Sequence, residues 1–406
     1  MNVLLSAYAC EPDKGSEPLV GWRWAEEVAA LGLQVWVLTR SNNKAAIEAR
    51  MQRGDAPPLR FIYFDFGPLM LRLKKLPGGL HAYYYLWQIA AFFVARKAHR
   101  SIGFGWVHHI TFVTVRFPSF MGFLGIPFLL GPLGGGEFSP PQLRRRLGWR
   151  FWWVETLRDW TLRAHALDVF RRVGMNRATH VFATSEASKQ CLPRAVQART
   201  EVLLAIGGEG QRTPTQRQRN AGEPIRLLYA GQWRELKGLP LAFEAMAQAR
   251  RQAGQTIHLT LVGSGPAEAQ WRASVAQLGL LDSVEFKGWV ARDELLGMYS
   301  DYDAFVFPST HDSGGLVVLE AMSFGVPVFA LDCGGPSVSV TEDSGCKIGV
   351  ENQTYDEVVA ALCAAMLRLN DAEQVARWRR GAFARAAALT WARQVRRAYE
   401  VVLKDN

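Results

Sequence analysis

The chain has 406 residues, more than one ordinary hydrophobic core supports, so we expect two domains. Its composition, with 49% hydrophobic and 21% charged residues, excludes a disordered or fibrous protein. The net charge of +10 favours anionic partners such as nucleotide sugars, anionic lipids or nucleic acids, although a basic surface without any partner has the same charge.

Cysteine spacing and the apolar runs bear on the cellular compartment. The five cysteines are scattered and include no CxxC or Cys/His pattern, which predicts a reducing compartment and no metal site. Residues 1–5 run straight into a strand without a preceding basic region, so we expect no secretion signal. The aromatic run at residues 83–94 is about half a membrane span long. We therefore expect a cytoplasmic protein without transmembrane helices.

The opening residues have the pattern of a Rossmann-type unit. An apolar strand is predicted at residues 2–8, a polar loop with a glycine at 11–17, an amphipathic helix at 19–31 and a second strand at 35–39. The loop lacks the GxGxxG fingerprint, so we do not expect a bound dinucleotide.

Two stretches mix basic and aromatic side chains. Residues 70–100 combine lysine and arginine with six aromatic residues, and residues 142–177 contain nine arginines, three acidic residues and several tryptophans. Such mixtures suit the surface of an anionic membrane or a lipid acceptor. For residues 70–100 the alternative is a helix whose aromatic side chains belong to the core and whose basic ones form its solvated face. Single-stranded nucleic acid also attracts such residues, but no nucleic-acid fold signature accompanies them, so we expect no nucleic-acid partner.

Two later strands of the first half lead to candidate site residues. The strand at 106–112 contains His108 and His109, and a histidine pair at a strand end is a candidate for catalysis. The alternative is a structural role, because a histidine on a strand more often has its hydrogen bonds satisfied by the fold. The strand at 126–130 is followed by GPLGGGE at residues 131–137. Three consecutive glycines predict a loop that lines a cleft rather than one that only packs.

The chain divides in a polar, basic stretch at residues 206–224, whose composition predicts an interdomain linker. We expect an N-terminal domain at residues 1–205 and a C-terminal domain at 225–388, because strands and helices alternate in both. A final helix at 389–406 is basic on one face.

In the second half, predicted strands end in loops with special residues. The strands at 225–230, 257–262 and 284–286 precede the loops GQWRELKG, GSGP and GWV. Lys237, in the first of these loops, can offer its ammonium group to a phosphate. The alternative is a solvated lysine in a turn.

The stretch at residues 304–336 is the most informative. A short apolar strand at 304–307 is followed by a polar loop with two glycines, a helix at 316–324, a strand at 326–331 and a second glycine turn. Glycines let backbone N–H groups approach a ligand closely. A helix that starts directly behind such a loop binds anions, because its free N–H groups and its dipole point at the loop.

This stretch resembles the donor-site motif of glycosyltransferase family 4, which consists of retaining enzymes of the GT-B fold. The motif is an acidic residue, seven others and a glutamate, here Asp312 to Glu320, with Asp312 in place of the commoner glutamate. The family pattern Gly-Arg-x-x-x-x-Lys-Gly matches at Lys237, the lysine that would clamp a diphosphate, but Gln232 stands at the arginine position. We hypothesise that Arg234 supplies the missing charge.

The resemblance implies an α/β protein of the GT-B fold. Such a protein has two Rossmann-like domains, whose parallel sheets face a central cleft, and a C-terminal helix that crosses back to the first domain. In that family the second acid binds the ribose of a nucleotide sugar, loop amides hold the diphosphate, and backbone holds the base. The first acid and a histidine lie near the sugar.

The resemblance also implies which residues form the site. The residues implied for donor binding are Gly15, Gln232, Arg234, Lys237, Gly263, Val290, Ser313, Gly314, Gly315, Leu316 and Glu320. The catalytic candidates are Asp312, His109 and His108, of which His108 matches the family position better; those facing the acceptor or the cleft are Ser16, Glu17, Gly135, Gly136 and Glu137. For Glu17, an ordinary strand-to-helix turn is an equal alternative.

The expected activity is transfer of a hexose, with retention, from a UDP- or GDP-linked sugar to a glycan or polyprenyl-linked acceptor in cell-envelope or exopolysaccharide biosynthesis. The basic aromatic stretches predict peripheral contact with the inner face of an anionic cell membrane. No DxD pair stands where a metal would act, so we expect neither metal nor cofactor. The alternatives are a sugar-nucleotide epimerase of the same fold and a membrane-associated scaffold with a degenerate site.

Overall fold

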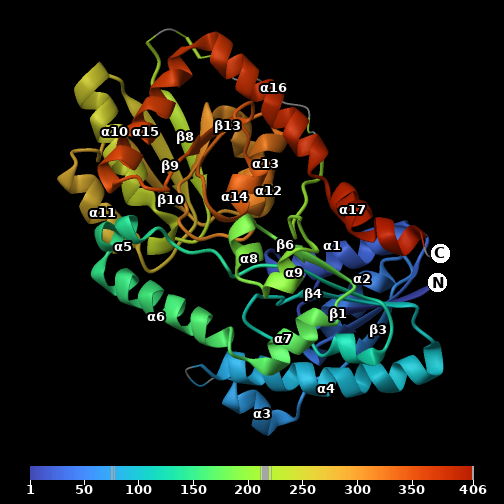
Figure 1. The fold of residues 1–406 in the computed structure, drawn as a ribbon. Helices are drawn as coiled ribbons and strands as arrows, with labels where there is room; N and C mark the ends of the chain where they lie inside the picture. Colours follow the sequence, from blue (N-terminus) through green and yellow to red (C-terminus); the bar gives the residue numbers. More distant parts are fainter. Residues whose placement is uncertain (75, 77, 211, 213–218, 221, 405–406) are drawn as a thin grey trace. The chain divides into compact units, whose positions relative to one another are not determined.

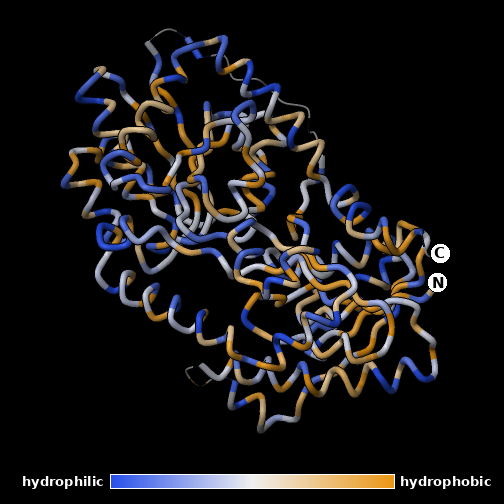
Figure 2. The backbone as a smooth tube through the Cα atoms, in the orientation of Figure 1, coloured by the Kyte–Doolittle hydropathy of each residue, from blue (hydrophilic) through white to orange (hydrophobic). Residues whose placement is uncertain are grey.

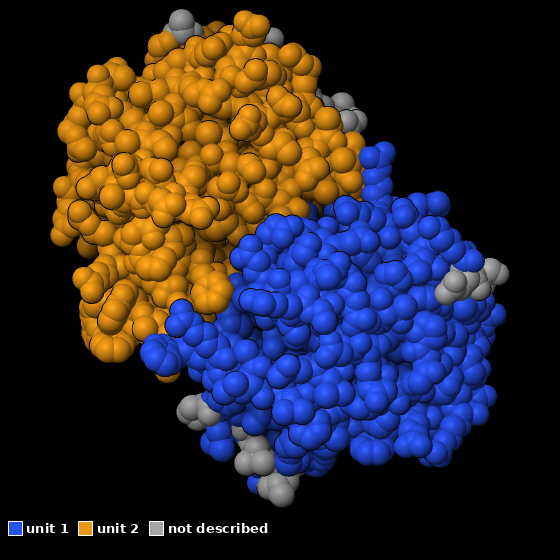
Figure 3. Space-filling view, in the orientation of Figure 1, with its two compact units in different colours: residues 1–136, 160–206, 391–406 blue, residues 137–159, 207–390 orange. Residues whose placement is uncertain are grey.

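The computed structural model describes residues 1–404 except 75, 77, 211, 213–218 and 221. These residues form two compact units (Figure 3). Unit 1 comprises Met1–Gly136, Trp160–Ile206 and Trp391–Asn406, and unit 2 comprises Glu137–Asp159 and Gly207–Thr390. Much of the linker predicted at 206–224 lies outside the described residues.

Unit 1 contains a seven-stranded parallel sheet in the order β3-β2-β1-β4-β5-β6-β7 (Figure 1). Its central strands are continuous runs of buried residues, because helices cover both faces of such a sheet. The strands are β1 Asn2–Ala7, β2 Gln34–Thr39, β3 Arg60–Tyr63, β4 Trp106–Thr111, β5 Phe128–Leu133, β6 His180–Ala183 and β7 Thr200–Val202. The helices are α1 Glu17–Ala30, α2 Lys44–Gln52, α3 Pro68–Leu73, α4 Gly79–Ile102, α7 Val169–Asn176, α8 Glu186–Gln190, α9 Arg194–Gln197 and α17 Trp391–Lys404.

Unit 2 contains a six-stranded parallel sheet in the order β10-β9-β8-β11-β12-β13. The strands are β8 Ile225–Ala230, β9 Ile257–Val262, β10 Val284–Gly288, β11 Ala304–Phe307, β12 Val328–Leu331 and β13 Gly345–Ile348. The helices are α5 Pro141–Leu147, α10 Leu239–Ala253, α11 Glu268–Gln277, α12 Arg292–Met298, α13 Leu316–Ser323, α14 Gly334–Ser339, α15 Tyr355–Leu367 and α16 Ala372–Ala388; α6 Trp149–His165 begins in unit 2 and ends in unit 1. Hydrophobic segments, orange in Figure 2, include the strands of both sheets.

Strand order positions the site of each unit. In unit 2 the chain builds β8, β9 and β10 outward to one side and then returns to place β11 on the other side of β8. The loops after β8 and β11 therefore leave the sheet in opposite directions and open a crevice between them, the usual ligand site of parallel sheets. The same reversal occurs in unit 1 between β1 and β4.

Two segments pack away from their neighbours in sequence. The C-terminal helix α17 packs on α1 in unit 1. Residues 137–159, predicted to lie in the N-terminal domain, belong instead to unit 2. Polar contacts hold them there: Gln142 Nε2 donates to the Val350 carbonyl at 2.6 Å, and Gln270 Nε2 donates to the Leu147 carbonyl at 3.1 Å. The helix pattern of this segment gave no sign of which sheet it would join.

The aromatic residues of α4 have two different environments. Tyr83, Tyr84 and Trp87 are buried in the hydrophobic core of unit 1, as the packing alternative for this stretch predicted. Phe93, in contrast, is 59% exposed. Among the described residues, no helix combines the length and the apolar character that a membrane span requires.

Candidate functional site

Backbone contacts join the loops at the carboxyl ends of β8, β9 and β10. The Gly263 N–H donates to the Gly288 carbonyl at 2.8 Å, and the Gly231 N–H donates to the Val262 carbonyl at 3.0 Å. A Cβ atom on Gly263 would lie 1.9 Å from the Gly231 carbonyl oxygen, so only glycine allows this approach. The predicted donor contact of Gly263 stays a prediction, because loop packing already explains the glycine.

Lys237, in the loop after β8, contacts Asp312, in the loop after β11. Lys237 Nζ lies 2.5 Å from Asp312 Oδ2. Gly238 has a φ of +66°, and a Cβ there would lie 2.1 Å from the Pro308 carbonyl oxygen, so the loop that carries Lys237 presses against the end of β11. The Thr310 N–H donates to the Leu236 carbonyl at 2.9 Å and fixes this register. The crevice between β8 and β11 therefore presents an ammonium group beside a carboxylate.

The donor loop, defined here as residues 308–315, is braced by the second glycine turn. The Gly335 N–H donates to the Asp312 carbonyl at 2.8 Å. A Cβ on Gly334 would lie 2.2 Å from the Asp312 carbonyl oxygen, and one on Gly335 would lie 2.4 Å from that of Ser313. Both glycines are therefore needed for the turn to touch the donor loop.

Helix α13 starts directly behind the donor loop. Gly315 precedes it with a φ of +76°, and Asp312 Oδ1 accepts a hydrogen bond from the Gly314 N–H at 3.1 Å. The predicted contacts Ser313, Gly314, Gly315 and Leu316 are all half-buried at this end of the helix. The positive end of the α13 dipole and the ammonium group of Lys237 thus belong to the same crevice and favour an anion there.

Glu320, one turn further along α13, is clamped by an arginine. Its Oε1 atom accepts hydrogen bonds from Arg292 Nε at 3.1 Å and from Arg292 Nη2 at 2.9 Å. The Tyr299 hydroxyl lies 3.4 Å from the other oxygen, Oε2. Glu320 is only 9% exposed, so the guanidinium group of Arg292 balances a nearly buried carboxylate.

A polar network links the 137–159 segment to the donor loop within unit 2. Ser313 Oγ donates to Glu137 Oε2 at 3.1 Å, and the side chain of Glu137 is buried. Arg158 Nη2 donates to the Glu137 carbonyl at 2.8 Å. Glu137, predicted to line a cleft, therefore lies beside the donor loop.

A second part of this network reaches His311. Arg158 Nη1 contacts His311 Nδ1, and it donates to Glu155 Oε2 at 3.1 Å. Ser139 Oγ donates to the same Glu155 oxygen at 2.8 Å. Burial raises the pKa of Glu155, but the hydrogen bond to His311 and the charge of Arg158 outweigh burial and lower this pKa to about 2. Glu155 is therefore a carboxylate at all physiological pH values.

Three further predicted donor residues surround the crevice. Gln232 and Arg234 are exposed on the loop between β8 and α10, and Val290 is half-buried just after β10. The Gln232 carbonyl accepts a hydrogen bond from the Tyr229 hydroxyl at 3.0 Å, which orients the loop backbone and not the Gln232 side chain. The hypothesis that Arg234 supplies the positive charge missing at Gln232 stays a prediction.

The two histidines of β4 lie in the core of unit 1. His108 is 0% exposed and its ring has two partners: Nε2 donates to the Gly131 carbonyl at 2.7 Å, so Nδ1 accepts from the Tyr399 hydroxyl at 3.0 Å. His109 is 1% exposed, and its Nε2 lies 3.2 Å from the Tyr84 hydroxyl. Both side chains are buried because helices cover both faces of the parallel sheet, as the structural alternative expects. A catalytic role of either histidine stays a prediction.

The remaining predicted residues of unit 1 lie at loop ends. Gly15 and Ser16 are exposed before α1, and the space around Gly15 is open. Glu17 Oε1 accepts a hydrogen bond from the Phe112 N–H at 2.7 Å, and burial raises its pKa. A Cβ on Gly136 would lie 2.6 Å from Ser188 Cα, and Gly135 has a φ of +82°. Glu17 and Gly136 thus have packing roles that account for them.

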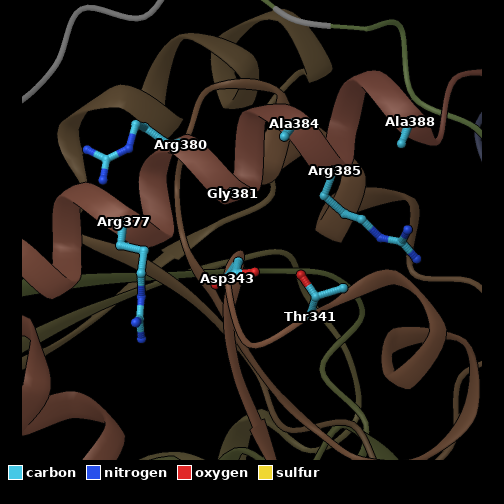
Figure 4. Close-up of a pocket in the computed structure, with 8 residues that line it drawn as sticks. All are labelled: Thr341, Asp343, Arg377, Arg380, Gly381, Ala384, Arg385 and Ala388. Carbon is cyan, nitrogen blue, oxygen red and sulfur yellow. The ribbon is translucent and has the colours of Figure 1, made fainter.

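A hollow on the outer side of unit 2 is a poorer candidate. It has a volume of about 480 Å³ and lies between α16 and the turn that contains Thr341 and Asp343. Figure 4 shows that its arginines, Arg377, Arg380 and Arg385, extend in different directions and do not converge on one point. Arg385 donates instead to the Ser339 carbonyl at 2.9 Å. Within the described part of the chain, no group of three or more His, Cys, Asp or Glu side chains is arranged to hold a metal ion.

Sequence reasoning missed Arg292, Glu155, Arg158 and His311 as supports of the site. Arg158 and Glu155 were counted only as members of an arginine-rich stretch, and their partner His311 lies 153 positions from Arg158. Arg292 lies 28 positions from Glu320 and begins a short helix. An arginine at the first position of a helix, where it opposes the dipole, is the one local signal that would have singled it out.

Comparison with known proteins finds a family that matches this site. Residues 211–384, which include the donor loop, α13 and Lys237, match the family of glycosyl transferases group 1. A colanic acid biosynthesis glycosyltransferase of Escherichia coli K12, WcaL, described as putative, is 32% identical over 129 residues, or 30% of this chain and 32% of that protein. The chain spans about a third of the length of the curated relatives that it matches.

Solved structures share the fold of the full chain. Sucrose-phosphate synthase from Thermosynechococcus elongatus has a TM-score of 0.63 at 22% identity, with both chains fully covered. Anabaena HepE, in complex with UDP and glucose, has a TM-score of 0.57 at 17% identity and covers 100% of this chain and 99% of its own. The predicted fold of two Rossmann-like domains with parallel sheets, that of GT-B glycosyltransferases, is therefore confirmed.

Proposed function

We propose that the protein is a retaining glycosyltransferase that moves a hexose from a UDP- or GDP-linked sugar to a glycan or polyprenyl-linked acceptor. The product would belong to the cell envelope or to an exopolysaccharide. One observation carries the proposal: Lys237, Asp312 and the start of α13 share one crevice, and Glu320 follows on the same helix. The match of residues 211–384 to group 1 glycosyl transferases and the UDP and glucose bound by the similar HepE support the same donor class.

The chemistry of such a transfer fits the charges of the crevice. Breaking the bond between the sugar and the diphosphate leaves negative charge on the phosphate oxygens, so preorganised positive groups stabilise the transition state most. In this proposal Lys237 and the N-terminus of α13 supply such groups, and no metal ion is needed to offset the charge of the phosphates. Asp312 is proposed to lie beside the sugar, and Oε2 of Glu320, the oxygen that Arg292 does not bind, to accept a hydrogen bond from a ribose hydroxyl.

The cellular setting follows from the acceptor. A polyprenyl-linked acceptor is anchored in a membrane, whereas nucleotide sugars are water-soluble. We therefore infer that the enzyme works in the cytoplasm, in peripheral contact with the inner face of an anionic membrane. The relative WcaL, whose name places it in colanic acid biosynthesis, supports an envelope or exopolysaccharide product.

The decisive experiment is a donor screen that follows release of nucleoside diphosphate, with and without lipid-linked acceptors. The double variant Lys237→Ala, Glu320→Gln is expected to lose at least a hundredfold in kcat/KM. Lys44→Ala serves as a control, because Lys44 is an exposed lysine of unit 1 that contacts Glu48 and the ring of Tyr63, both outside the crevice. Undiminished turnover of the double variant would refute the proposal.

The screen also separates the rival functions. A non-catalytic scaffold is favoured if isothermal titration calorimetry detects no affinity for either UDP or GDP. An epimerase is favoured if the sugar of the nucleotide sugar changes its stereochemistry without release of nucleoside diphosphate.

A further inference from the structure

Helix α6 presents an apolar face to solvent. Trp149, Trp153, Leu157 and Trp160 follow one another at steps of four, four and three residues, so they lie along one side of the helix. Their exposed fractions are 69%, 59%, 66% and 67%. Val154, beside this row, is 62% exposed. A surface helix ordinarily turns its polar side to water, whereas α6 exposes a row of large apolar side chains.

The opposite side of α6 is already in use. Phe151, Glu155 and Leu162 are buried, and Arg158 donates its hydrogen bonds to Glu155 and to the Glu137 carbonyl. Rotation of α6 about its axis would therefore bury the tryptophans only by breaking a buried polar network. The exposed tryptophan row is therefore available to a partner that is not part of these intramolecular contacts.

The charges around the row identify the kind of partner. Arg145 on α5 and Arg150 and Arg163 on α6 are exposed. The guanidinium group of Arg150 lies 5.4 Å from the centre of the Trp149 ring. No acidic side chain lies on the outward side of α6 between Trp149 and Trp160, since Glu155 and Asp159 face the other way, toward Ser139 and Arg144. Tryptophan and arginine together suit the headgroup level of an anionic bilayer, where indole rings are half-wet and arginine meets phosphate.

We propose that the outward face of α6, formed by Trp149, Trp153, Leu157 and Trp160, docks on an anionic lipid bilayer with the helix lying in the plane of the interface. This proposal rests on the membrane contact proposed above and names the surface that makes it. A face of three tryptophans among arginines has the composition of an interfacial helix, and the net charge of +10 adds long-range attraction to an anionic surface.

The test is flotation of the full chain with lipid vesicles. One set of vesicles contains phosphatidylcholine and phosphatidylglycerol, and the other contains phosphatidylcholine only. Wild-type protein is expected to float with the anionic vesicles, and the triple variant Trp149→Ala, Trp153→Ala, Trp160→Ala to bind at least tenfold more weakly. Leu281→Ser is the control, because Leu281 is 73% exposed elsewhere in unit 2; it is expected to bind like wild type. A thermal melt checks that each variant is folded.

Two results would overturn the proposal. One is equal binding of wild type and the folded triple variant to anionic vesicles. The other is sedimentation of wild type as a dimer without lipid, with the triple variant a monomer, because the row would then be an interface between two copies of the chain. Charge is tested separately: Arg150→Gln with Arg163→Gln is expected to weaken binding to anionic vesicles several-fold and to flatten its dependence on salt.

Failure of the docking surface is distinguishable from failure of the proposed reaction. Release of UDP or GDP from a nucleotide sugar with a water-soluble acceptor, measured without vesicles, requires the crevice of unit 2 and no lipid. If the transferase function is correct, the triple variant keeps this release while it loses flotation. If the transferase function is wrong, flotation of wild type with anionic vesicles is unaffected.

Discussion

The two carboxylate oxygens of Glu320 have unequal surroundings. Arg292 binds Oε1 twice, whereas Oε2 has only a long contact of 3.4 Å from the Tyr299 hydroxyl. A carboxylate held at one oxygen keeps the other in a fixed direction, which is what a ribose hydroxyl requires. In the proposed function Arg292 is thus a positioning residue that acts through Glu320.

The variant Arg292→Gln tests this role. It leaves Glu320 with its charge nearly buried and its orientation free, so we expect UDP or GDP to bind about tenfold more weakly, which is about 1.4 kcal/mol. The preference for UDP over 2′-deoxy-UDP is expected to shrink with it, a change that a general loss of stability would not produce. Isothermal titration calorimetry measures both, and Arg292→Lys should restore part of the effect.

A control for Arg292 is available in the same unit. Arg272 pairs with Glu268 across one turn of α11, and both side chains are exposed. Arg272→Gln is expected to leave both affinities unchanged. Full ribose discrimination in Arg292→Gln would count against the positioning role.

His108 makes the stability of unit 1 depend on pH. Burial lowers its pKa to about 4, although the hydrogen bond to Gly131 opposes this change. Because an unfolded histidine titrates near 6.5, the unfolded chain binds more protons between about pH 4 and 6.5, and the free energy of unfolding falls as the pH falls through that window. The full difference is on the order of 3 kcal/mol for this one group.

We therefore expect urea unfolding of unit 1 to require markedly less urea at pH 5 than at pH 7. His108→Gln should be less stable at pH 7 and should lose less stability between the two pH values. His258, an exposed histidine of unit 2, provides the control His258→Gln, which should keep the wild-type dependence. A pH dependence that is the same in His108→Gln and wild type would show that other groups cause it.

Among the secondary-structure elements, α6 is unusual because its two sides face different partners. Its inward side holds His311 of the donor loop through Arg158 and Glu155, and its outward side carries the exposed tryptophans. Anything that shifts α6 along its axis or tilts it therefore moves a support of the donor loop. Lipid docking and donor binding should then be coupled, since a shared element biases both sites.

Arg158→Gln tests the coupling. It removes the hydrogen bond to the Glu137 carbonyl and leaves Glu155 with less compensation, so we expect the KM for the nucleotide sugar to rise about tenfold, which is about 1.4 kcal/mol, with a smaller change in kcat. Anionic vesicles are expected to lower the KM of wild type and to have no effect on that of Arg158→Gln. Arg150→Gln, on the outward side of the same helix, should keep the wild-type KM in the absence of lipid.

Local signals in the sequence explain what could be predicted. The donor loop, α13 and the ion pair partners Lys237 and Asp312 stand next to glycines and strand ends that are visible within a few residues, and these elements were predicted where the structure has them. The roles of Arg158, His311 and Arg292 depend on contacts between distant parts of the chain, which periodicity does not encode. For His108 the strand itself was predicted from the local sequence. Its burial could not be predicted, because both faces of β4 are buried only in the assembled sheet.

The protein as a whole consists of two compact units, and the chain passes from one unit to the other four times. Unit 1 collects residues from both ends of the chain, and unit 2 includes the 137–159 segment as an insertion from within the first half. The alternation of strands and helices predicted two domains, but not this exchange, because α5 and α6 carry the same helical pattern whichever sheet they join. What assigns α5 and the first part of α6 to unit 2 is a set of long-range contacts such as that from Gln142 to Val350.

This division predicts how a nucleotide would affect unfolding. All the residues that form the proposed donor crevice, from Lys237 to Glu320, belong to unit 2. A ligand that binds one folded unit stabilises that unit by about 2.7 kcal/mol at a hundred times its dissociation constant. We therefore expect UDP or GDP to raise the temperature of one calorimetric transition and to slow amide exchange in α13 and the donor loop, while β1 and β4 exchange as before. If both units gained the same protection, the nucleotide would have to contact both, and the crevice of unit 2 would be only part of its site.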